Sequence, residues 1–186
     1  MIKSISLAIL TGATLSLMTA CNSGNSTVDS AKQGQEASKD KAQNDDDVFG
    51  AYVGLKNALV DGNAEKAKER AGNVKKQIAS VKADKMTPDE IKDWNAQAAK
   101  LNADLDQIQG STDLKGQRAA FSHLSDDLLV NIKKYGLAKR TVYHDFCPMY
   151  NNGANWLSET KEIKNPYYGK DMMECGVDSE EIAPAK

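Results

Sequence analysis

Sulfur-bearing side chains gather near the C-terminal end of the chain, in the segment from Tyr143 to Gly176. Cys147 and Met149 form one group, and Met172 and Cys175 form another. Thiolate and thioether groups are soft ligands, which select Cu(I) and similar soft ions. These four side chains are therefore candidate ligands of one copper ion, whereas the adjacent Met173 is interpreted as a residue that packs against an aromatic ring.

The two cysteines have a second interpretation, a structural disulfide, which would make the protein a disulfide-stapled structural or protein-interaction module of the cell envelope. In an oxidising compartment such a bond would staple an irregular tail, typically with a stabilisation of ~2–4 kcal/mol. The sulfurs of a disulfide lie about 2.05 Å apart, whereas two thiolates on one tetrahedral ion, each at roughly 2.3 Å, lie about 3.8 Å apart. Both interpretations require Cys147 and Cys175 to be neighbours, and the sequence leaves both open.

The residue content gives little support to catalysis. The dithiol motif Cys-x-x-Cys of thiol redox enzymes is absent, and the chain's two histidines have no evident nucleophile partner. The net charge of −2 argues against nucleic acid, which favours a basic surface. We therefore expect a binding protein that is not an enzyme and does not bind nucleic acid.

The first residues read as a secretion signal. Residues 1–20 carry an early positive charge at Lys3 and an apolar run that is shorter than the ~20 residues of a membrane-spanning helix. Small residues before Cys21 resemble a bacterial lipobox, in which that cysteine becomes the lipidated first residue. We expect residues 21–47, which have almost nothing to bury, to be a disordered tether. The predicted location is the periplasmic side of the inner or outer membrane, held by the lipid anchor.

The middle of the chain predicts four helices. Apolar residues recur at helical spacing in four stretches, Val48 to Leu59, Ala67 to Val81, Ile91 to Ile108 and Phe121 to Tyr135. Thr87 to Glu90 reads as an N-cap, a proline at the first helical position and a capping-box glutamate. Short connections favour an antiparallel arrangement. The predicted fold class of residues 48–186 is all-α, an antiparallel four-helix bundle with an irregular C-terminal tail packed on it. Residues 142–146 read as a short extended run within that tail.

The tail also carries a family resemblance. Its motifs are Cys147-Pro148-Met149, Trp156-Leu157-Ser158, Asn165-Pro166-Tyr167-Tyr168-Gly169, and Met172 with Cys175-Gly176. Together they resemble a bacterial domain of unknown function that occurs in secreted lipoproteins and at the C-terminus of periplasmic adaptor subunits of heavy-metal efflux pumps. The resemblance covers about Val48 to Val177. It implies periplasmic handling of copper or a similar soft ion, with efflux-pump components as partners.

The Cys147-Pro148-Met149 element is also similar to one in small heavy-metal-binding domains. In those domains a histidine follows the methionine, whereas Tyr150 stands there in this chain. His144, three residues before Cys147, is the candidate for the missing imidazole ligand.

Overall fold

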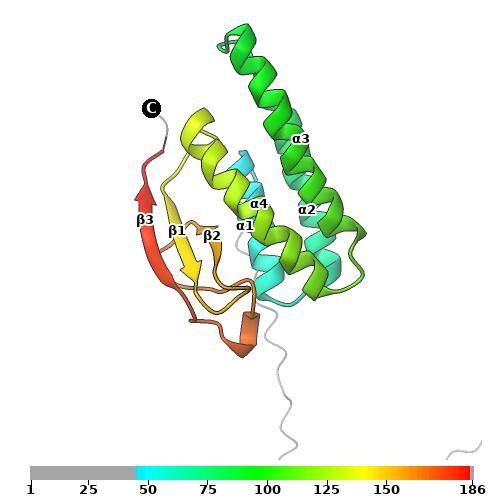
Figure 1. Ribbon diagram of the computed structural model, residues 1–186, viewed down its shortest axis with the longest axis vertical. Coiled ribbons are helices and arrows are strands. Elements are labelled where there is room, and N and C mark those ends of the chain that lie inside the picture. The colour runs from blue at the N-terminus through cyan, green and yellow to red at the C-terminus, as the bar shows by residue number, and fades with distance from the viewer. Residues whose placement is uncertain (1–44, 185–186) are drawn as a thin grey trace, which may run out of the picture. The chain divides into compact units, whose positions relative to one another are not determined.

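The computed structural model describes residues 45–184, so the predicted signal, Cys21 and most of the predicted tether lie outside the described residues. Four helices are followed by three strands and a short 3₁₀ helix (Figure 1). The elements are α1 (Val48–Val60), α2 (Ala64–Ala79), α3 (Pro88–Gly110), α4 (Leu114–Tyr135), β1 (Val142–Cys147), β2 (Ala154–Ser158), η1 (Gly169–Asp171) and β3 (Val177–Ile182). The four predicted helices are therefore confirmed.

Each helix begins at a polar cap that binds an otherwise unpaired backbone amide. The side chain of Asp47 accepts from Gly50 N of α1 at 2.6 Å. At the start of α3, Glu90 N donates to Thr87 Oγ1 at 3.3 Å, and Thr87 N donates to Glu90 Oε2 at 2.8 Å. This pair is the predicted capping box. At the C-terminal end of α4, Gly136 adopts a left-handed conformation with φ of 64°, which explains why the helix ends there.

The helices bury apolar stripes against one another in chain order, α1 on α2, α2 on α3 and α3 on α4. α1 is the most buried, because all but one of its residues are shielded from solvent. Leu101 and Leu105 of α3 are also fully buried. Within residues 45–184, no helix is both long and apolar enough to cross a bilayer.

The predicted all-α fold class is wrong, because the C-terminal tail forms a three-stranded antiparallel sheet in the order β2-β1-β3. A tail packed against helices buries its backbone amides and carbonyls, and those groups need hydrogen-bond partners. Strand pairing supplies them. The predicted extended run at 142–146 is the central strand of this sheet, but nothing local in the sequence indicated its two partners. The protein is a mixture of helices and sheet.

The sheet lies beside the helices with β2 innermost and β3 outermost (Figure 1). β2 contacts both α4 and α1. Its backbone is anchored on the helical core, since Leu157 N donates to the hydroxyl of Tyr52 at 3.2 Å, and that hydroxyl also lies 2.7 Å from Ser125 Oγ of α4. The helices therefore fix the position of the strand pair that carries Cys147.

Candidate functional site

The two cysteines of the tail lie side by side. Cys147, the last residue of the central strand β1, is fully buried. Cys175 lies in the loop between η1 and β3 and is half-buried. Their Sγ atoms are 3.8 Å apart, and both are free thiols. The structure thus brings together two sulfurs that are 28 positions apart in the sequence.

A buried asparagine holds the loop that carries Cys175. Asn165 Nδ2 donates to the carbonyl oxygen of Cys175 at 2.5 Å, and Asn165 N donates to the carbonyl oxygen of Met173 at 2.8 Å. Its Oδ1 accepts from the backbone amides of Tyr167 and Tyr168 at 2.8 and 3.2 Å. One side chain therefore cross-links the two ends of the loop and sets the position of Cys175.

Close packing fixes the same loop from the other side. Gly176 lies against the indole of Trp156, so that a Cβ added at this glycine would stand 2.5 Å from Trp156 Cη2. Trp156 is fully buried on β2 and meets the ring of Tyr167 edge-on at 6.1 Å. Tyr167 in turn packs against Phe121 of α4 at 6.0 Å. The aromatic residues of the tail therefore dock the cysteine loop on the helical core.

The methionines differ in their exposure. Met149, two residues after Cys147, is 60% exposed. Its carbonyl oxygen accepts from the hydroxyl of Tyr168 at 3.0 Å. Met172 is half-buried and precedes Cys175 in a turn closed by a 3.2 Å bond from Cys175 N to Met172 O. Met149 thus presents its thioether to solvent just after one cysteine, and Met172 stands one turn before the other.

His144 faces away from the cysteines. It lies three residues before Cys147 on the same strand, and side chains an odd number of positions apart project from opposite faces. His144 Nε2 lies 2.8 Å from Asn155 Oδ1, and Nδ1 lies 3.8 Å from Glu180 Oε2. Asn155 also bonds to Asp126 of α4. The structure therefore places this histidine on the face toward α4, apart from the sulfur pair.

Among residues 45–184, no three His, Cys, Asp or Glu side chains are grouped so that they could hold one metal ion. The sulfur pair is thus the candidate centre, and thioethers are the remaining candidate donors. Burial raises the pKa of the Cys175 thiol, and the neighbouring Cys147 raises it further. The Cys175 thiol is therefore expected to carry its proton in the metal-free protein at neutral pH.

A buried polar cluster lies near the pair, and sequence reasoning missed it. Lys56 of α1 is only 3% exposed and donates to Ser158 Oγ at 3.4 Å. Asp145, two residues before Cys147 on the same face of β1, is fully buried, and neither carboxylate oxygen has a hydrogen-bond partner among the described residues. Burial raises the pKa of Asp145 to about 6, the nearby charge of Asp178 adds to the rise, and the charge of Lys56 opposes part of it. Burial likewise lowers the pKa of Lys56.

Of the buried polar residues near the cysteines, only Lys56 could have been predicted from the sequence. Lys56 is the only charged residue of α1, a helix that is otherwise almost entirely apolar or small, and such a cation has no polar face to occupy. Asp145 and Asn165 had no comparable local signal. Their burial depends on the sheet and on the loop that follows it.

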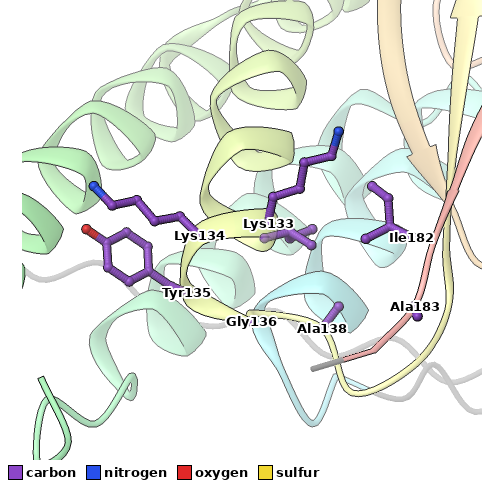
Figure 2. A pocket seen from close by; sticks show the side chains of 8 residues that line it. Lys133, Lys134, Tyr135, Gly136, Ala138, Ile182 and Ala183 are labelled. Carbon is purple, nitrogen blue, oxygen red and sulfur yellow. The ribbon is translucent and has the colours of Figure 1, made fainter. Parts of the chain in front are cut away.

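A separate pocket lies at the C-terminal end of α4. Its volume is about 410 Å³, and its lining is Ile132, Lys133, Lys134, Tyr135, Gly136, Ala138, Ile182 and Ala183 (Figure 2). Both lysines are already paired, Lys133 with Glu180 and Lys134 with Asp93, each at 2.6 Å. None of the predicted site residues lines this pocket.

Comparison with known families gives a match for the helical part of the chain. The family described as "Protein of unknown function (DUF3347)" matches residues 48–140, half of the chain. The chain belongs to this family. The match covers α1 to α4 and ends before β1, so the tail motifs that carried the sequence resemblance lie outside the matched residues. No curated protein and no solved structure matches the chain.

Proposed function

We propose that the protein is a non-catalytic binder of a soft metal ion, Cu(I), and that Cys147 and Cys175 supply the two principal ligands. The observation that carries this proposal is the Sγ–Sγ distance of 3.8 Å. Two thiolates at roughly 2.3 Å from a shared ion with tetrahedral angles stand about that far apart. A metal ion would enter with little movement of either strand or loop.

The number and type of the donors favour copper over zinc. A structural zinc site usually has four ligands from cysteine and histidine, and the described residues offer no third His, Cys, Asp or Glu at this place. Cu(I) is a soft ion that thiolates and thioethers select. Met149, exposed beside Cys147, and Met172, one turn before Cys175, are the proposed additional sulfur donors.

The difference in burial between the two cysteines suits a site that exchanges its ion. Cys147 is fixed in the central strand and shielded from solvent, whereas Cys175 is reachable from outside. A partner's thiolate would approach on the Cys175 side and take the ion by ligand exchange. We propose storage or transfer of the ion beside an efflux system, in line with the family resemblance of the tail.

Competition between the protein and a coloured Cu(I) chelator under reducing conditions tests the proposal. The chain with Cys21→Ala is suitable, because it leaves Cys147 and Cys175 as the only thiols of the three cysteines. We expect one Cu(I) per chain. Cys147→Ser and Cys175→Ser should each abolish tight binding, because one thiolate is lost.

Two methionine variants distinguish a thioether ligand from a general effect of replacing methionine by leucine. Met149→Leu should weaken binding, whereas Met86→Leu, a change of the same type in the loop between α2 and α3, should leave it unchanged. Cys147→Ser and Cys175→Ser that both bind as tightly as the parent chain would remove the tail from the chemistry.

The cellular setting is part of the proposal. The signal layout of residues 1–20 and the lipobox-like residues before Cys21 support a lipid-anchored protein on the periplasmic side of a membrane. Cys21→Ala should release the protein into the soluble fraction. Retention of the Cys21→Ala protein in the membrane would mean that another segment anchors it.

A further inference from the structure

We propose that Cys147 and Cys175 also form a reversible thiol–disulfide couple, in which Cys175 reacts first with an external disulfide, Cys147 then closes the bond, and closure shuts the metal site. Only the last step, the closing of the metal site, rests on the proposed Cu(I) function. The oxidant is a disulfide, either of a small thiol or of another protein.

Accessibility sets the order of the two cysteines. A disulfide molecule in solution can reach Cys175, which is half-buried in a loop, but not Cys147, which is fully buried at the end of β1. The second step is internal, because the two Sγ atoms already lie 3.8 Å apart. Cys175 is thus the attacking residue and Cys147 the resolving residue.

The chemistry balances as two exchanges. The Cys175 thiolate attacks one sulfur of the external disulfide, a mixed disulfide forms, and the first external thiolate leaves and takes up a proton. The Cys147 thiolate then attacks Cys175 Sγ, and the second external thiolate leaves and takes up the other proton. The protein loses two hydrogens, and the external disulfide is reduced to two thiols.

The required movement falls on the side chain of Cys175, because Asn165 and Trp156 hold the backbone of its loop. The sulfurs must approach by roughly 2 Å to reach the bond length of a disulfide. Cys147 is held in the central strand, with Ala154 of β2 as its partner. Cys175 lies outside the strands, in a turn that begins at Met172. Closure therefore moves Cys175 toward Cys147, with the sheet unchanged.

Oxidation and metal binding exclude each other, since the sulfurs of a disulfide are no longer thiolates. Loss of the disulfide by exchange with a reducing thiol would reopen the site.

Mass spectrometry of the Cys21→Ala chain after treatment with oxidised glutathione tests the order of attack. The chain with both tail cysteines should lose two hydrogens and keep no adduct. Cys147→Ser, or Cys147→Ala if serine unfolds the core, should trap one glutathione on Cys175. Cys175→Ser should form an adduct at least about tenfold more slowly, because its remaining thiol is buried. Equal adduct rates in the two single variants, or an adduct that persists when both cysteines are present, would overturn the proposal.

A second measurement connects the couple to the metal. The oxidised chain should not bind Cu(I), and the Cu(I)-loaded chain should resist oxidised glutathione. Cu(I) binding by the oxidised chain that equals the binding by the reduced chain would contradict the link. If the reduced chain itself fails to bind Cu(I), the proposed function is overturned, while the adduct pattern still supports the thiol–disulfide couple by itself.

Discussion

Replacement of Asp145 by asparagine tests how the buried carboxylate shapes stability. The pKa of Asp145 is about 6 in the folded protein because of burial, and that of an aspartate in an unfolded chain is about 3.9. The folded state therefore binds the proton more tightly. The stabilisation that Asp145 gives to the folded state is fully present below the pKa of the carboxyl in the unfolded chain. It is lost as the pH rises through about 6. The loss between about pH 4 and pH 7.5 amounts to about 2 kcal/mol.

Urea denaturation of the reduced, metal-free protein, followed by tryptophan fluorescence at several pH values, measures this change. Asp145→Asn also changes the unfolding free energy through altered packing. That change is the same at every pH, so it cancels when pH 4 and pH 7.5 are compared. The difference in unfolding free energy between Asp145→Asn and the parent chain should shift by about 2 kcal/mol in favour of the variant from pH 4 to pH 7.5.

Asp84→Asn is the matched control, because Asp84 is exposed in the loop between α2 and α3 and is not among the groups that shift the pKa of Asp145. Its difference from the parent should stay constant within about 0.5 kcal/mol over the same range. Parallel pH profiles for the parent and Asp145→Asn would refute the argument that burial holds the carboxylate in an unfavourable ionised state at neutral pH.

Three further substitutions, the first with a control variant, test the scaffold and the loop. Leu101→Ala should lower the unfolding free energy by ~2–5 kcal/mol in urea denaturation, since Leu101 is fully buried; Val130→Ala, at a residue 59% exposed, should change it by less than about 0.5 kcal/mol, and equal effects would contradict the core assignment. Gly176→Ala should reduce thermal stability and Cu(I) affinity together, because its Cβ would collide with the indole of Trp156; an unchanged melting temperature would argue against the packing. Asn165→Ala should cost about 2–4 kcal/mol and weaken Cu(I) binding, because it leaves buried backbone groups unpaired. Full Cu(I) affinity in Asn165→Ala would show that this side chain does not position Cys175.

The helices could be predicted because their signals are local. The capping box of Thr87 and Glu90 and the stop at Gly136 both act within a few residues of the helix end that they set. The adjacency of Cys147 and Cys175 followed from chemistry, since either a shared ion or a disulfide demands it.

The sheet could not be predicted because its pairing is distant in sequence. β3 pairs with β1 across more than 30 positions, and its sequence, Val-Asp-Ser-Glu-Glu-Ile, lacks the apolar alternation of a half-buried strand. The orientation of His144 depends on that sheet. The side chains of His144 and Cys147 project from opposite faces of β1, and His144 lies toward α4. Proximity along the chain was therefore a misleading guide to a shared site.

Copper K-edge X-ray absorption of the Cu(I)-loaded protein tests the central claim most directly. We predict a first shell of sulfur donors, supplied by Cys147 and Cys175. Cys147→Ser and Cys175→Ser should retain little Cu(I) and therefore give little sulfur signal, whereas His144→Gln should keep the sulfur shell, because that ring faces α4. A shell of nitrogen and oxygen, or a spectrum that is the same in the parent chain and in Cys147→Ser, would contradict the account.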